Sequence, residues 1–146
     1  MSNSSPAARM VVDAWERLRD DASVVRHAVF VVEQSVPVEI EMDDQDAVSV
    51  HAVAYDAEGR PVATGRLLPD GHIGRMAVMA RTRGAGVGGQ VLRALIERAR
   101  AQGHAEVALN AQTHARAFYE GHGFVAEGDE FVEAGIPHVS MRLALD

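Results

Sequence analysis

Residues 73–101 read IGRMAVMARTRGAGVGGQVLRALIERARA, which predicts a strand, a glycine-rich turn and an amphipathic helix in succession. Within six residues the turn holds four glycines: Gly84, Gly86, Gly88 and Gly89. Glycine adopts positive φ at little cost and lets the backbone approach a ligand closely. The N-terminus of the following helix offers unpaired N–H groups and a partial positive charge. The stretch therefore predicts a cradle for a phosphate or pyrophosphate, and Arg81 and Arg83 at its entrance can reach the same anion.

The composition favours one domain over residues 1–146. A chain of this length buries roughly 68–70% of its unfolded surface, so it needs no disulfide or metal to hold its core. The absence of cysteine excludes thiolate metal sites and a cysteine nucleophile. The seven histidines form no HxH or HExxH pair. We therefore expect no metal.

Charge and hydropathy narrow the function classes further. The net charge of −7 argues against a general nucleic-acid binder. All 14 basic residues are arginine, which excludes a Schiff-base lysine and a lysine-dependent phosphate loop. No apolar run approaches the ~18 residues of a membrane span, and the first ten residues lack the apolar core of a signal peptide. These features predict a cytoplasmic protein that does not bind membranes and whose residues 1–8 are disordered.

Hydrophobic periodicity and turn residues predict an α+β or mixed α/β domain with the order β, α, three antiparallel β, α, β, α, β, β. The expected strands are residues 9–14, 50–55, 61–68, 72–78, 104–110, 124–126 and 139–145, and the expected helices cover residues 20–31, the segment after the glycines, and 113–122. Asp20 and Asp21 suit the first turn of the helix over residues 20–31, although residues 29–32 are strand-like by propensity. The acidic run over residues 39–46 is expected to be a solvated loop. Alternatively, it attracts a cationic amine.

The glycine turn allows two interpretations. Gly84, Gly86 and Gly89 match the GxGxxG fingerprint of dinucleotide-binding proteins. Three features oppose that interpretation: residues 79–83 separate the strand from the first glycine, Asn110 stands where an acid would end the next strand, and only 57 residues follow Gly89. A doubly wound sheet does not fit in the remaining chain.

The second interpretation rests on Arg83-x-x-Gly86-x-Gly88, which resembles the R/Q-x-x-G-x-G/A pyrophosphate loop of the GCN5-related N-acetyltransferases. Further blocks in the right order are VFVVEQSVPVEIEMDDQD, LNAQTHARAFYEGHGF with Tyr119, and FVEAGIPHVSM. Together they resemble the ElaA-like branch over residues 26–141. One departure is Ala134, where many relatives carry an acid. The resemblance implies a mixed sheet of six to seven strands with flanking helices, splayed between strands four and five, with pantetheine in the opening.

The resemblance implies an N-acetyltransferase that moves an acetyl group from acetyl-CoA to a primary amine by direct attack in a ternary complex. The acceptor would be a small-molecule amine or a peptide. Tyr119 would protonate the departing sulfur. Glu33 is the first candidate for general base, and the alternatives are His51, His114 and His138. The implied CoA contacts are Met76, Ala77, Val78, Arg81, Arg83, Gly84, Gly86, Val87, Gly88, Gly89, Asn110 and Phe118.

Two other functions remain open at this stage. The VF-x-x-EQ block also resembles the N-terminal part of acyl-homoserine lactone synthases, which are longer than this chain. A CoA-binding regulatory module without catalysis would carry the same cradle. The oligomeric state is open, with a homodimer among the options.

Overall fold

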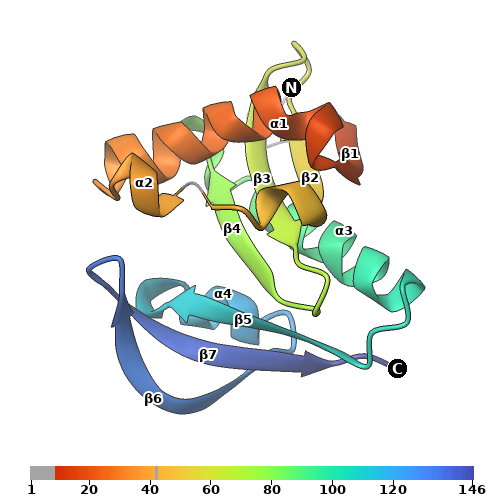
Figure 1. The fold of residues 1–146 in the computed structure, drawn as a ribbon, viewed down its shortest axis with the longest axis vertical. Helices are drawn as coiled ribbons and strands as arrows, with labels where there is room; N and C mark the ends of the chain where they lie inside the picture. Colours follow the sequence, from red (N-terminus) through yellow and green to blue (C-terminus); the bar gives the residue numbers. More distant parts are fainter. Residues whose placement is uncertain (1–8, 42) are drawn as a thin grey trace.

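The computed structural model describes residues 9–41 and 43–146 (Figure 1). The expectation of disorder for residues 1–8 lies outside the described part. The first sheet is antiparallel with the order β1-β2-β3-β4. Its strands are β1 (Arg9–Ala14), β2 (Val50–Tyr55), β3 (Pro61–Leu67) and β4 (Ile73–Val78). The second sheet has the order β5-β7-β6. Its strands are β5 (Glu106–Gln112), β6 (Val125–Glu133) and β7 (Ile136–Ala144).

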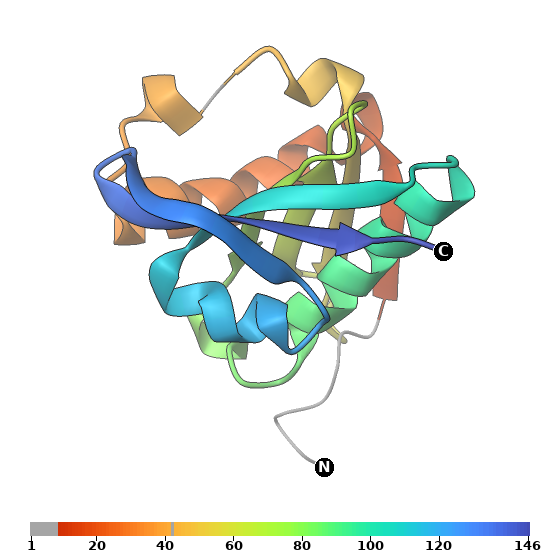
Figure 2. The same cartoon turned by 90° about the horizontal axis from the view of Figure 1, so that it is seen from below.

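Helices cover both faces of the first sheet (Figure 2). On β2, Val53 and Tyr55 face α1 (Trp15–Arg26), where they pack with Leu18. The alternate residues Ala52 and Ala54 join the main core with α3 (Val87–Ala101). This alternation follows from the period of two along a strand. The shorter helical elements are η1 (His27–Glu33), α2 (Val38–Glu41), η2 (Asp46–Val48), η3 (Ala80–Thr82), η4 (Thr113–Ala115) and α4 (Arg116–Glu120).

Within the described residues, one isolated bridge joins the backbones of the two sheets. His72 and Ala108 form an isolated parallel bridge, and the Ala108 N–H donates to the Gly71 carbonyl at 3.2 Å. Beyond this point β4 and β5 run apart, as Figure 1 shows. The predicted fold class and the predicted splay between strands four and five are therefore confirmed, and the strands number seven.

A bulge on β4 accompanies the divergence. The register between β3 and β4 shifts between Thr64 and Arg66, opposite Arg75. Arg75 has a φ of 50°, which is a costly conformation for a residue with a side chain. A bulge bends its strand and increases the local twist, so this one contributes to the turning of β4 away from β5.

The first helix differs from the expected residues 20–31. It begins earlier, at Trp15, and continues beyond Arg26 as a π-helix over His27–Glu33. Asp21 suggested a helix start because acids favour the first turn. The structure gives it another role, since its carboxylate accepts a hydrogen bond from the Tyr55 hydroxyl at 2.6 Å. The strand-like propensity of residues 29–32 is overridden by packing, because Val29 is buried with Val25 and Ala77.

The acidic run after Pro37 is not a free solvated loop. Glu41 and Asp46 are buried. The Arg26 guanidinium is only 2% exposed and donates to Glu41 and to both oxygens of Asp46, at 2.8 and 3.0 Å. Arg66 donates to Asp46 at 2.9 Å and to Asp43 at 2.7 Å, and its hydrogen bond lowers the pKa of Asp43. The arginines thus neutralise Glu41, Asp43 and Asp46, while Glu39 and Asp44 are exposed, so only part of the run matches the expected solvated loop.

This network yields a stability prediction. Arg26→Met removes the cation and leaves two buried carboxylates without it, so we expect the free energy of unfolding to fall by about 3–5 kcal/mol. Urea denaturation followed by circular dichroism measures the change. The matched control is Arg60→Met, which removes a largely exposed ion pair with Asp56 in the β2–β3 turn and should scarcely move the midpoint. Equal urea denaturation midpoints for the two variants would contradict the claim that burial makes the Arg26 network costly to break.

In residues 9–41 and 43–146, no helix has both the length and the apolar character that crossing a membrane requires.

Candidate active site

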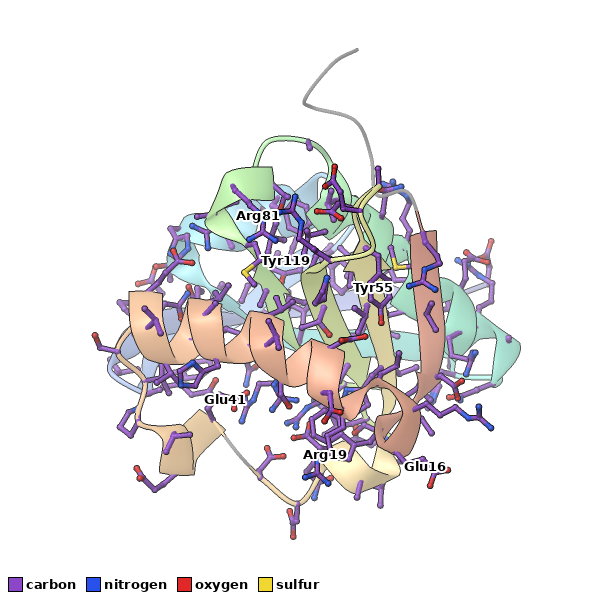
Figure 3. All side chains as sticks on the ribbon, turned by 90° about the horizontal axis from the view of Figure 1, so that it is seen from above. Glu16, Arg19, Glu41, Tyr55, Arg81 and Tyr119 are labelled. Atoms are coloured by element: carbon purple, nitrogen blue, oxygen red, sulfur yellow. The ribbon has the colours of Figure 1, made fainter. Side chains whose placement is uncertain are left out.

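A cleft of about 1190 Å³ opens where β4 and β5 diverge. Its walls come from η1, β4, the glycine turn, the start of α3, β5, α4 and the tip of the β6–β7 hairpin. The structure brings to this cleft the first-choice catalytic residues and all but one of the predicted CoA contacts: Glu33, Met76, Ala77, Val78, Arg83, Gly84, Gly86, Val87, Gly88, Gly89, Asn110, Phe118 and Tyr119. The exception is Arg81, which lies on η3 and is exposed (Figure 3).

The glycine turn has the form of an anion cradle. Gly84 and Gly86 have φ of 87° and 80°, and Gly86 is the N-cap of α3. A Cβ built on either residue would meet no heavy atom within 4 Å, so the space beside them is open. A Cβ on Gly88 would come within 3.3 Å of the Val78 side chain, so that glycine allows close packing instead. The open space and the N-terminal amides of α3 fit a phosphate or pyrophosphate group.

Val78 presents its main chain to the cleft. The Met79 N–H donates to the Val62 carbonyl at 2.8 Å, on the β3 side. Amides of successive residues point to opposite sides of a strand. The N–H and carbonyl of Val78 therefore point toward β5, where a peptide-like ligand arm could pair with them as an added strand would.

Glu33 and Arg83, predicted for separate roles, contact one another. Two nitrogens of the Arg83 guanidinium donate to the two carboxylate oxygens of Glu33, at 2.7 and 2.9 Å, and Nε donates to the Val78 carbonyl at 3.0 Å. The hydrogen bond from Arg83 lowers the pKa of Glu33. A carboxylate held in this way is a weaker base than a free one. The arrangement therefore reduces the case for Glu33 as the general base.

Tyr119 lies on α4, packed edge-on between Phe118 and Phe124, and it is 8% exposed. No described residue forms a hydrogen bond with its hydroxyl. Burial raises the pKa of Tyr119 to about 12. Its phenol therefore keeps its proton through the ordinary pH range, as a proton donor must.

The three candidate histidines occupy different places. His51 is buried away from the cleft, where Nε2 contacts the Asp46 carbonyl at 3.0 Å and burial lowers its pKa. This position argues against His51 as the base. His114 lines the cleft and is exposed. His138 lines the cleft on β7 and is 7% exposed.

Several cleft residues were not selected from the sequence, and two of them contact one another. Gln34 follows η1 and Gln112 ends β5, and their amides exchange hydrogen bonds of 3.0 and 3.5 Å. The pair links the two halves of the molecule across the cleft. Gln112 could have been placed in the cleft only from the register of β5 with β7, which pairs it with His138. That register cannot be read from an apolar strand alone. Within the described part, no three His, Cys, Asp or Glu side chains gather as a metal site would require.

A sheet that splays beside a glycine cradle, with a buried tyrosine in the opening, is the arrangement expected of the GCN5-related N-acetyltransferases. The family model described as an acetyltransferase (GNAT) domain matches residues 18–145. The chain belongs to this family, and the family is one of acyltransferases.

Individual relatives also support membership of this family. The chain is 43% identical over 137 residues to the uncharacterized N-acetyltransferase YjcF of Bacillus subtilis (strain 168), covering 91% of this chain and 97% of the relative. Among solved structures, an acyl-CoA N-acyltransferase from Pseudomonas aeruginosa superposes with a TM-score of 0.82 at 32% identity, covering 93% and 99% of the two chains. Escherichia coli ElaA superposes with the same TM-score of 0.82 at 28% identity, covering 92% and 98%. The resemblance to ElaA is thus confirmed.

Proposed function

We propose that this protein transfers an acetyl group from acetyl-CoA to a primary amine. The observation that carries the proposal is one cleft that holds both the open glycine cradle at Gly84 and Gly86 and the proton-bearing hydroxyl of Tyr119. The cradle would hold the pyrophosphate. The pantetheine arm would lie along the edge of β4, which places the thioester near the far end of the cleft.

The thioester supplies an activated acyl group, so the chain need not form a covalent intermediate. The Val78 N–H, which points into the cleft, would donate a hydrogen bond to the thioester carbonyl oxygen. Tyr119 would give its proton to the sulfur as the carbon–sulfur bond breaks. Arg83 would contact the pyrophosphate after leaving Glu33, since its guanidinium borders the glycine turn.

A thiol-release assay tests the proposal. The wild-type chain is incubated with acetyl-CoA or, in a second arm, with a long-chain acyl-CoA. The acceptors are, in turn, benzylamine, spermidine, kanamycin and tetra-alanine, and the acylated product is identified by mass spectrometry. We expect amine-dependent release of CoA thiol with at least one acceptor class. Binding of acetyl-CoA with no turnover across the panel would favour the regulatory module. Turnover with long-chain acyl-CoA alone would favour a synthase-like acyltransferase.

A further inference from the structure

We propose that His138, supported by Glu133, is the general base that takes a proton from the acceptor amine. The assignment rests on the proposed N-acetyltransferase function, and it names a base other than Glu33. Four features of the cleft carry it: the face of the sheet on which His138 lies, the hydrogen bond that fixes its ring, the carboxylate beside it, and its position relative to Tyr119.

The strand register places His138 on the face of the second sheet opposite the main core. His138 pairs with Gln112 on β5 and with Phe131 on β6. The neighbouring Val139 and Met141 belong to the core cluster that contains Tyr119. Because side chains alternate between faces, His138 points away from that cluster. It shares its face with Gln112, which contacts Gln34 on the side of η1.

The His138 ring is held in the form that a base requires. Nδ1 lies 2.6 Å from the Ile136 carbonyl oxygen, which can only accept a hydrogen bond. Nδ1 therefore carries the hydrogen in the neutral ring, and Nε2 carries the lone pair. Phe131 stacks on the ring at 5.9 Å between centroids, which fixes its orientation. The ring needs no rearrangement to accept a proton at Nε2.

Glu133 would stabilise the product of that transfer. Its Oε2 lies 3.7 Å from Nε2, so a protonated ring gains an ion pair. The other residues that pack against the ring from β5 and β6, Gln112 and Phe131, carry no charge. Glu33, by contrast, already has a cation bound to both of its oxygens. His138 therefore has a carboxylate beside its lone-pair nitrogen, whereas Glu33 has a cation on both of its oxygens.

The positions of His138 and Tyr119 also suit two different proton transfers, one from the acceptor amine and one to the departing sulfur. Both side chains line the cleft, but they approach it from opposite faces of the second sheet. An ammonium acceptor loses its first proton to Nε2, and this proton then passes to solvent. The freed nitrogen forms the C–N bond as the C–S bond breaks. The sulfur receives the Tyr119 proton, and the second proton lost by nitrogen restores the phenol. The balance is one proton released for each acetyl group transferred.

The test compares acceptors that need a base with one that does not. Spermidine is protonated at pH 7, whereas hydroxylamine is largely neutral. We expect His138→Gln to lower kcat with the responsive amine of the panel (spermidine as the first probe) by about 100-fold or more. With hydroxylamine the loss should stay below about tenfold, and the KM for acetyl-CoA should not change. A merely structural role would lower both rates alike.

Two further variants keep the test decisive. Glu133→Gln, at a half-exposed side chain, should lower kcat with the ammonium acceptor by roughly tenfold and spare hydroxylamine. His27→Gln, at an exposed histidine outside the cleft, is the control and should change neither rate. Full spermidine turnover by both cleft variants, with selective loss in Glu33→Gln, would overturn the assignment and leave the proposed function intact. No turnover of any amine by the wild type would overturn both.

Discussion

Replacing Gly86 by valine is expected to weaken acetyl-CoA binding by on the order of 100-fold, or about 2.8 kcal/mol. Gly86 has a φ of 80°, a conformation that a β-branched residue avoids. The valine side chain would also occupy the open space beside the turn, where the pyrophosphate is proposed to lie. Both effects displace the N-terminal amides of α3 from the anion. Isothermal titration calorimetry with acetyl-CoA measures the loss.

The chain supplies a matched control for this variant. Gly59 also has a φ of 80° and has nothing within 4 Å of a built Cβ, but it lies in the β2–β3 turn. Gly59→Val therefore imposes similar backbone strain away from the cleft. We expect it to lower the melting temperature as Gly86→Val does while acetyl-CoA binds normally. Normal binding by Gly86→Val would show that the turn does not hold the ligand.

Tyr119→Phe is expected to lower kcat by about 100-fold while the dissociation constant of acetyl-CoA stays the same. The substitution removes only the hydroxyl, and no described residue bonds that hydroxyl, so the packing against Phe118 and Phe124 is kept. Because the pKa of Tyr119 is raised to about 12, the phenol stays protonated as the pH rises to about 11. The wild-type rate should therefore show no alkaline decline from this group below that pH.

The second tyrosine is the control. Tyr55 is also buried with a pKa raised to about 12, chiefly by burial, but it lies under α1 and its hydroxyl donates to Asp21 (Figure 3). Tyr55→Phe should lower stability by the loss of one hydrogen bond, about 1 kcal/mol, and leave kcat unchanged. A rate for Tyr119→Phe equal to that of Tyr55→Phe would remove Tyr119 from the mechanism.

The sequence predicted the elements that have strong local signals. Residues 73–101 form the predicted strand, turn and helix because apolar periodicity and glycine act within a few residues. The order of elements along the chain followed from periodicity and turn residues, and the splay followed from the family resemblance. The predicted start of the first helix was wrong. Asp21, which suggested that start, instead accepts a hydrogen bond from Tyr55, a residue distant in the chain.

The remaining features depend on contacts between distant segments. The burial of Glu41 and Asp46 could not be read from an acidic run, since their partners Arg26 and Arg66 come from other elements. The ion pair between Glu33 and Arg83 joins residues 50 positions apart. His138 could be assessed only once the β5–β7 register placed it on a face of the sheet. In each case local propensity carries no information about the partner.

The central claim is that acetyl-CoA binds between β4 and β5 with its pyrophosphate at the glycine turn. Amide hydrogen exchange with and without saturating acetyl-CoA tests it directly, because it reports the location of the ligand whether or not an acceptor is known. We predict slower exchange over residues 76–90 and in β5, little change in β1, and much weaker protection of Gly86→Val at the same concentration of acetyl-CoA. Unchanged exchange over residues 76–90 in the wild type, or protection confined to another part of the molecule, would contradict the account.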